Sequence, residues 1–435
     1  MINNLVFVSQ AYLGFAGTQV LERAAEQARL SIVLETDEEL HPRLVPYIAT
    51  IHRLPGNSKH GLQPSFDVVD LTGVVRREID AAGADPATVA LFCQHEDNVL
   101  PVAHVRRLTG IRGDGPELVT QFRNKVAMKQ AVAERLPHAL PRYRKLLAER
   151  ASEDPSGYYD ELVGALGSER LIVKPTTGAG SLNVATVSSA EDLARAARQI
   201  RSDLRELEYE VDEYIDGTLY QCDSFVREGK VVFSGILELG CANFDFVQGR
   251  PLSVYPVTDE ELYKELFAFN QEVVTTLGFQ SGSTHLELFV RRGQGGTTSV
   301  TFLEIAARVP GGLGVPFHER NAGINLIDAN IDLALGHDAK HESSVVRRNN
   351  VVSALLPVGH GRIIYLNEPD IMSAYSIDWR VKVGDMVDVR TLVDTAGILT
   401  LVNDDPVVLR RDFESLQGYT PVTCVAEVPP SCGVR

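Results

Sequence analysis

Apolar and polar positions near the start of the chain follow the pattern of a β-α-β unit. The apolar run Leu5–Val8 predicts a buried strand, and apolar residues at helical spacing over 20–28 predict a helix before a second strand at Ile32–Leu34. Another apolar run, Val89–Phe92, leads into polar residues and a helix that should end near Gly110. This order predicts a doubly wound α/β arrangement for the first part of the chain.

The pattern changes further along the chain. Helix-like stretches interrupted by Pro137 and Pro141 fill about 117–150, and then runs of alternating apolar and β-branched residues predict antiparallel strands around one long helix. This middle region is typical of an α+β domain. The predicted elements are strands at 171–173, within 211–237 and within 285–305, and a helix around 260–277.

The last part of the chain predicts short strands separated by turns. Strands are expected at Val351–Leu356, Arg362–Tyr365 and Val381–Arg390, with turns at Gly384–Asp385 and Ala396–Gly397. The chain of 435 residues is long enough for about three domains. A hydrophobic fraction of 44% and a charged fraction of 23% are those of a globular enzyme.

Charge and cysteine content narrow the classes of function. A net charge of −16 disfavours binding to nucleic acid or to anionic membranes, so any nucleotide needs a locally positive pocket. The five cysteines are scattered without CxxC spacing, which indicates reduced thiols. With no basic leader and no apolar run near the roughly 20 residues of a membrane span, we expect a cytoplasmic protein without membrane association.

A strand followed by a glycine-containing loop is the first candidate for chemistry. Lys174 directly follows the predicted strand at 171–173. It precedes Gly178 and Gly180, whose backbone N–H groups could approach phosphate oxygens. The lysine precedes the glycines, so this is not a Walker loop. By itself the segment fits a surface hairpin with a solvated lysine equally well.

Acidic residues on two later strands are the second candidate. Glu287 and Glu304 lie in apolar β-like runs, and Arg308 and Gly311–Gly312 follow the second of them. Carboxylates on neighbouring strands could share magnesium ions, and an arginine could offset charge on a transferred phosphoryl group. Taken singly, each glutamate is more simply a solvated strand residue; their position after the lysine–glycine loop favours the metal interpretation.

The order of these motifs resembles the ATP-grasp superfamily, specifically its L-amino acid ligase-like members, over essentially the whole chain. Arg123–Met128 is similar to the family's first lysine motif, and Val173–Pro175 with its loop is similar to the second. Val211–Ile215 resembles the hinge that holds adenine, and Glu287, Glu304 and Arg308 match the metal and phosphate positions.

The resemblance implies a fold and its boundaries. It implies an N-terminal doubly wound pre-ATP-grasp domain, a two-part ATP-grasp fold and a C-terminal mixed subdomain. The expected boundaries are 1–112 for the first, 113–340 for the second and 341–435 for the third. Within the second, the small lobe covers about 113–208, the hinge about 209–217 and the large lobe about 218–340.

The resemblance also implies roles for individual residues, with ATP and Mg²⁺ (or Mn²⁺) as cofactors. Lys174 and Arg308 would be catalytic and Glu287 and Glu304 would bind the metal. The residues expected to hold the nucleotide are Lys125, Lys174, Thr176, Thr177, Gly178, Ala179, Gly180, Ser181, Asp212, Glu213, Tyr214 and Ile215. The residues expected to contact substrate are Glu96, His285, Gly311 and Gly312.

Two positions depart from the family pattern. Many relatives have asparagine where this chain has Ala306, so we expect a water in place of one metal ligand. The acid that commonly binds ribose corresponds to Leu219, and Asp223 or another acid would have to substitute for it.

The resulting hypothesis is an ATP-dependent carboxylate–amine ligase. It would phosphorylate a small carboxylic acid, such as an amino acid, and join the acyl phosphate to an amine, giving an amide or dipeptide with ADP and phosphate. An ATP-grasp carboxylase or transformylase, or a decayed nucleotide-binding module, is the alternative. The sequence leaves open a homodimer and a carrier-protein acceptor, and indicates neither.

Overall fold

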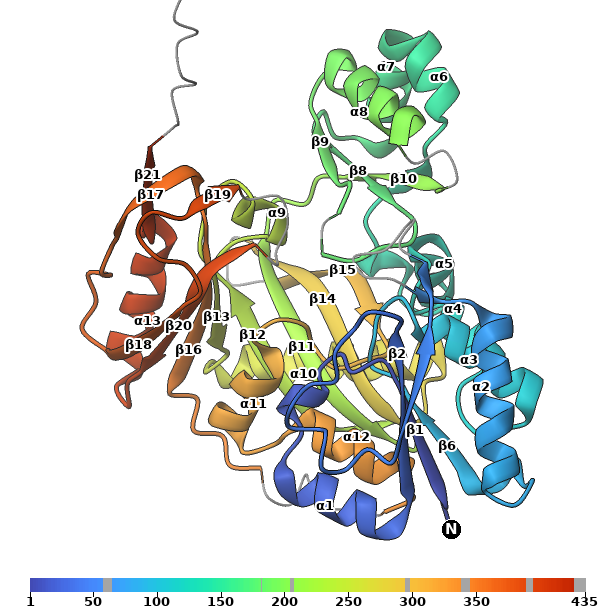
Figure 1. Cartoon of the computed structure of the whole chain (residues 1–435). Helices are drawn as coiled ribbons and strands as arrows, with labels where there is room; N and C mark the ends of the chain where they lie inside the picture. The colour runs from blue at the N-terminus through green and yellow to red at the C-terminus, as the bar shows by residue number, and fades with distance from the viewer. Residues whose placement is uncertain are drawn as a thin grey trace, which may run out of the picture.

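A computed structural model describes residues 1–57, 65–180, 182–203, 207–293, 298–337, 345–388 and 394–425. An N-terminal parallel sheet and a small antiparallel sheet lie beside a large antiparallel sheet, which the C-terminal part of the chain extends (Figure 1). The predicted α/β and α+β fold class is therefore confirmed. Among the described residues, every helix is too short or too polar to cross a membrane.

The N-terminal sheet is parallel, with strand order β3-β2-β1-β6. Leu5 and Phe7 of β1 pack in the core that includes α1, whereas Val6 and Val8 pack in the core that includes α2 and α3. Because helices cover both faces, the predicted doubly wound arrangement is confirmed. The elements are β1 (Asn4–Val8), α1 (Thr18–Gln27), β2 (Arg29–Glu35), β3 (Thr50–Leu54), β4 (Gly56–Asn57), β5 (Ser65–Phe66), α2 (Val68–Ala81), β6 (Val89–Phe92) and α3 (Val99–Thr109).

The small antiparallel sheet has strand order β7-β10-β8-β9 and lies above the large sheet in Figure 1. Its core joins Val173 and Val211 of the strands to Leu162 and Leu193 of the helices. The strand β7 lies inside the stretch for which we predicted only helices. The elements leading to and forming this lobe are α4 (Pro116–Thr120), α5 (Lys125–Ala133), β7 (Tyr143–Lys145), α6 (Ala148–Glu153), α7 (Pro155–Leu166), β8 (Leu171–Pro175), β9 (Ala185–Val187), α8 (Ala190–Asp203) and β10 (Tyr209–Glu213).

The large sheet has eight strands in the order β15-β14-β11-β12-β13-β16-β20-β18. The long helix α10 packs on one face, against side chains such as Cys222, Ile236 and Leu286. Its elements are β11 (Thr218–Arg227), β12 (Lys230–Leu239), α9 (Asn243–Phe246), β13 (Leu252–Pro256), α10 (Glu260–Leu277), β14 (Gly282–Arg292), β15 (Thr298–Ala306), α11 (Gly314–Ala322), α12 (Leu326–Ala334), β16 (Val351–Pro357), β18 (Ala374–Trp379) and β20 (Thr395–Val402).

On the opposite face of the large sheet, the side chains of β11 are buried near the end of the strand and line cavities near its start. Phe225 packs in a core shared with the N-terminal sheet and α12, and Asp223 is fully buried. Gln221 and Leu219, further toward the start of the strand, line cavities. Because residues two apart in a strand share a face, this face runs from closed core to open cavity toward the small sheet.

Two predictions for the C-terminal part are wrong. Ala396–Gly397 is not a turn but lies inside β20, where Gly397 pairs with Trp379 of β18. A Cβ on Gly397 would lie 2.7 Å from the Asp378 carbonyl oxygen, so this glycine permits close strand contact. The strand predicted over 381–390 is reduced to β19 (Met386–Asp388) in the described residues. The remaining elements are β17 (His360–Leu366), α13 (Pro406–Ser415) and β21 (Val422–Val425).

Candidate active site

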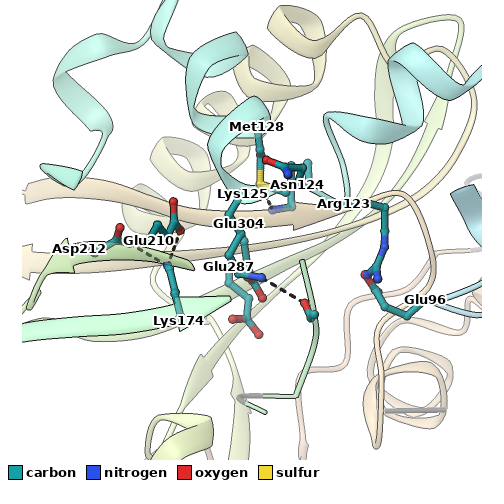
Figure 2. Close-up of polar contacts among 12 residues, drawn as sticks. Glu96, Arg123, Asn124, Lys125, Met128, Lys174, Glu210, Asp212, Glu287 and Glu304 are labelled. Atoms are coloured by element: carbon teal, nitrogen blue, oxygen red, sulfur yellow. Dashed lines mark hydrogen bonds and ion pairs between the residues drawn. The ribbon is translucent and has the colours of Figure 1, made fainter. Parts of the chain in front are cut away.

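A buried cluster of two lysines and two carboxylates lies where α5 meets the small sheet. Figure 2 shows Lys174 of this cluster beside Glu210 and Asp212. Lys129 Nζ is 3.0 Å from Glu210 Oε1 and 2.6 Å from Asp212 Oδ1. Lys174 Nζ is 2.8 Å from Asp212 Oδ2 and 3.6 Å from Glu210 Oε1. The two positive and two negative charges balance, so the cluster holds the Lys174 ammonium in place without leaving a net buried charge.

The electrostatics of this cluster keep Lys174 charged. Burial alone would lower the pKa of Lys174, but the carboxylates of Asp212, Glu210 and Glu304 outweigh burial and raise it. Burial and the neighbouring Lys174 lower the pKa of Lys129. Lys174 therefore supplies a permanent positive charge at the end of β8, as the predicted phosphate contact requires.

Lys125 connects the small sheet to the large one. Asn124 caps α5 by accepting hydrogen bonds from the amides of Val126 and Ala127, which places Lys125 on the first turn of the helix. Its Nζ lies 3.0 Å from Glu304 Oε2 and donates to the Gly178 carbonyl at 3.1 Å. A single lysine thus contacts both the predicted metal carboxylate and the predicted phosphate loop.

Glu287 and Glu304 are directly opposite each other on β14 and β15. Gln221 donates to Glu287 Oε1 at 3.2 Å. Burial would raise the pKa of Glu304, but Lys125 and Lys174 lower it to about 2, so this group is ionised. Within the described part of the chain, the second oxygens, Glu287 Oε2 and Glu304 Oε1, make no hydrogen bond.

This donor set fits a hard cation. Ionised carboxylate oxygens are the protein ligands that Mg²⁺ prefers, and Mg²⁺ usually completes its shell with phosphate and water oxygens. The described residues assemble no group of three or more His, Cys, Asp and Glu side chains that could hold a metal. The two glutamates would therefore hold Mg²⁺ together with a bound phosphate.

The predicted phosphate loop is only partly placed at the cavities. Gly178, Ala179 and Gly180 line them, and φ values of 139° at Gly178 and 64° at Gly180 favour glycine. Thr176 is buried, and its backbone is already hydrogen-bonded. Its amide donates to the Glu208 carbonyl, and its carbonyl accepts from the Lys125 amide. Neither Thr176 nor Thr177 lines a described cavity, and Ser181 lies outside the described residues.

The first cavity, of about 410 Å³, lies between the small and large sheets. Its lining combines the lysines and loop glycines with an apolar part that comprises Ile172, Val184, Leu219, Phe289 and Leu303. The size and the apolar walls suit a nucleotide base next to a phosphate site. Of the residues predicted to hold the nucleotide, those that line this cavity are Lys125, Lys174, Gly178, Ala179, Gly180, Asp212, Glu213, Tyr214 and Ile215.

The carboxylates of two hinge residues are bound by other side chains of the protein, so the predicted contact with adenine would use backbone groups. The Asp212 carboxylate forms ion pairs with the buried lysines. The Glu213 carboxylate accepts a hydrogen bond from Arg142 at 2.6 Å. The amides of Glu213 and Tyr214 donate to backbone carbonyls, whereas the Ile215 amide makes no hydrogen bond in the described part of the chain. Ile215 therefore presents the backbone donor best suited to a base, and β10 ends before it, at Glu213.

The second cavity, of about 570 Å³, adjoins the first. At one end, Glu96 is bound by both Arg123 and Arg308, and Arg123 also donates to Asp97 at 3.0 Å. Arg308 lines this second cavity and not the first, whereas Lys174 lines the first and not the second. Gly311 and Gly312, which we predicted to contact substrate, also line the second cavity.

His285 belongs to a buried chain of polar contacts. Its Nδ1 lies 2.6 Å from Asp223 Oδ1 and its Nε2 lies 3.4 Å from Glu287 Oε1, while His318 Nε2 lies 2.7 Å from Asp223 Oδ2. Burial would lower the pKa of His285, but Asp223 raises it to about 9. Asp223 is therefore not a substitute ribose ligand, as we had considered, because both its oxygens bind histidines.

Sequence reasoning missed several residues of this site. Lys129 could have been noticed because it lies four residues after Lys125, on the same face of a helix. Asp245, an acid that lines the first cavity, has no local signal in the sequence. His318 is buried against Asp223 and lines neither cavity.

Replacing Lys174 with alanine is expected to raise the KM for ATP by about 10- to 100-fold, because a charge-assisted hydrogen bond contributes about 1.5–3 kcal/mol. Steady-state ADP formation at varied ATP measures this change. The control is Lys145→Ala, which removes a lysine that is 61% exposed on β7 of the same sheet. An unchanged KM in the Lys174 variant would exclude the phosphate contact.

Comparison with known proteins finds a family model that matches part of the chain. Residues 168–316 match the family model described as an ATP-grasp domain, which covers β8, the hinge, β14 and β15. No curated protein matches the sequence significantly. The matched segment includes Lys174, Glu287, Glu304 and Arg308.

Solved structures share the fold over nearly the whole chain. An L-amino acid ligase from Bacillus licheniformis has a TM-score of 0.70 at 17% identity, with 98% of this chain and 99% of that chain covered. Biotin carboxylase from Campylobacter jejuni has a TM-score of 0.60 at 15% identity, covering 93% and 88%. N5-carboxyaminoimidazole synthetase from Staphylococcus aureus has a TM-score of 0.59 at 12% identity, covering 95% and 96%. The predicted resemblance to L-amino acid ligases is confirmed at the level of fold.

Proposed function

We propose that this chain, in which residues 168–316 form an ATP-grasp domain, is an ATP-dependent ligase that joins a small carboxylic acid to an amine through an acyl phosphate. The carboxylic acid we propose is an amino acid or a similar small molecule. ADP and phosphate are the other products. The expected domain boundaries and site roles given above form part of this proposal.

The strongest support for the proposed ligase function is that the two cavities meet and share lining residues. The same residues line both: Lys125, Gly178, Ala179, Gly180, Leu239, Asn243, Glu287 and Glu304. A nucleotide in the first cavity would therefore present its phosphates at the entrance of the second. Such an arrangement brings a phosphoryl donor and a second substrate together.

Phosphoryl transfer depends on charge at this junction. A carboxylate oxygen of the acid attacks the γ-phosphorus of ATP, the bond to the β,γ-bridging oxygen breaks, and ADP leaves. Lys125, Lys174 and the amides of the 178–180 loop hold the phosphates, and Arg308 faces the transferred group from the second cavity. Mg²⁺ bound by Glu287 and Glu304 would supply further positive charge to the phosphate oxygens.

The second step joins the amine. A neutral amine attacks the carbonyl carbon of the acyl phosphate, phosphate leaves, and the proton lost from nitrogen goes to phosphate or solvent. No protein nucleophile is required. The 178–180 loop lies between the cavities, where it can exclude water that would hydrolyse the intermediate.

The test is an incubation of the protein with ATP, Mg²⁺, hydroxylamine and single amino acids. We expect a hydroxamate and an equal amount of ADP, because hydroxylamine traps acyl phosphates. With candidate amines in place of hydroxylamine, mass spectrometry should detect the amide. AMP and pyrophosphate would instead indicate an acyl adenylate and contradict the proposal.

Two alternatives give different results in the same experiment. ADP formation that requires bicarbonate or formate would indicate a carboxylase or transformylase. The absence of ATP turnover with every acid would indicate a nucleotide-binding module without ligase activity. The joint presence of Lys125, Lys174, Glu287, Glu304 and Arg308 around the junction favours an active enzyme.

A further inference from the structure

The second cavity has two chemically different ends. Its charged end contains Glu96, Arg123 and Arg308. At the other end, each side chain that β12, β13 and β16 contribute is aliphatic. We call these five residues the aliphatic floor: Leu237, Leu239, Leu252, Val254 and Leu355.

Strand register makes this floor continuous. Leu239 is opposite Val254, and Leu252 is opposite Leu355, so these side chains point to one face of the sheet. Neighbouring strands lie about 4.8 Å apart, so the floor from β12 to β16 is about 10 Å wide. That width exceeds what a single small side chain such as that of alanine would cover.

Four of the five floor residues line the second cavity alone, and Leu239 lines both cavities. Leu252, Val254 and Leu355 line only the second cavity. They keep 9%, 8% and 9% of their surface accessible, whereas Leu399 and Leu401 on the adjoining strand β20 are 0% exposed. These aliphatic side chains therefore contact open space that an adenine base would not fill.

The same face connects the floor to the junction of the cavities. Glu304 is opposite Glu287, Glu287 is opposite Gln221, and Gln221 is opposite Leu237. A molecule whose carboxylate lies at the predicted site of phosphoryl transfer can therefore extend directly over the floor. This argues for the acid, rather than the amine, as the molecule that covers it.

We propose that the acid activated by this protein carries a large apolar side chain, of leucine or phenylalanine size, which packs on the aliphatic floor. This inference rests on the proposed ligase function. An apolar side chain gains contact and loses water there, whereas a charged side chain would lose its hydration without a partner from these strands.

The first experiment compares donor acids in the hydroxamate assay. Glycine, leucine, phenylalanine, aspartate and lysine are supplied singly, with ATP, Mg²⁺ and hydroxylamine. Leucine or phenylalanine is expected to give a kcat/KM at least about 10-fold above that of each other acid, since even one methylene in an apolar pocket changes kcat/KM by about 10- to 200-fold. A preference for glycine, aspartate or lysine would overturn the inference and leave the ligase proposal standing.

Two variants that change the floor in opposite ways test its position. Val254→Phe fills the cavity and should lower the phenylalanine-to-leucine ratio of kcat/KM at least about 10-fold; Leu355→Ala enlarges it and should raise this ratio. The control is Leu401→Ala, which removes a buried leucine of β20 outside the cavity and should leave the ratio unchanged. Equal losses with both donors in the two floor variants would overturn the assignment.

A binding measurement separates this inference from the proposed function. Calorimetric titration of leucine and aspartate into the protein with ADP and Mg²⁺ needs no turnover. Leucine binding that is at least about 10-fold weaker in Val254→Phe supports the floor even if no acid yields a hydroxamate. Tighter binding of aspartate than of leucine, or leucine binding that is unchanged in Val254→Phe, would overturn the assignment.

Discussion

Replacement of Glu304 by glutamine is expected to lower kcat for ADP formation at least about 100-fold. Glutamine keeps the size of the side chain but removes the charge next to Lys125 and opposite Glu287. Positive charge held at the transferred phosphate contributes several kcal/mol to the transition state, and each 1.36 kcal/mol corresponds to about a tenfold change in rate. Steady-state kinetics at saturating ATP and varied MgCl₂ measure the loss.

Affinity for adenosine should change little in the same variant. The apolar walls of the first cavity, such as Leu219 and Phe289, come from β11 and β14, and Glu304 is at the phosphate end. Calorimetric titration of adenosine checks this. The control is Glu261→Gln on α10, whose side chain is 86% exposed and pairs only with Lys264 among the described residues. Normal turnover by Glu304→Gln, or by protein kept in excess EDTA, would show that the metal assignment is wrong.

Elements with local signals could be predicted from the sequence. The helix expected around 260–277 has the observed bounds Glu260–Leu277. Asp259 caps it by accepting from the amides of Glu261 and Leu262, and Gly278 ends it with a φ of 71°. Both ends are thus encoded by residues next to the helix. The strands and helix of the first β-α-β unit could be predicted from the periodicity of apolar residues.

Features that depend on distant residues could not be predicted. Asp223 was considered as a ribose ligand, but its partners are His285 and His318, which lie 62 and 95 positions away in the sequence. The aliphatic floor joins three strands and has no motif. Gly397 carried a turn signal, yet the approach of β18 explains this glycine better. Local patterns identify the residue types of a site, whereas sheet register decides which of them meet.

Replacement of Lys129 by methionine is expected to destabilise the small lobe by about 3–5 kcal/mol, the usual cost of removing one partner from a buried ion cluster. The Lys129 side chain is 0% exposed, and without it Glu210 and Asp212 would share Lys174 alone. One Glu210 oxygen already has no hydrogen-bond partner among the described residues, so the cluster tolerates little further loss. Hydrogen exchange of peptides over 207–216, together with thermal unfolding followed by circular dichroism, measures the effect.

The matched control makes the same substitution at a lysine on the surface. Lys145→Met on β7 breaks an ion pair whose side chains are 61% and 60% exposed, and such pairs contribute about 0–1 kcal/mol. Tryptophan fluorescence is a poor probe here, because the single tryptophan, Trp379, lies on β18 of the large sheet. Equal exchange rates in the Lys129 variant and the wild type would contradict the prediction.

A second substitution distinguishes charge balance from loss of packing. Glu210→Gln in the Lys129→Met background leaves Lys174 with the single carboxylate Asp212, so one positive charge again faces one negative charge. If uncompensated charge causes the instability, the double variant should be more stable than Lys129→Met alone, since coupled residues are not additive. If lost contacts cause it, the two losses should add. Recovery in the double variant would establish that uncompensated negative charge, and not lost packing, causes the instability of Lys129→Met.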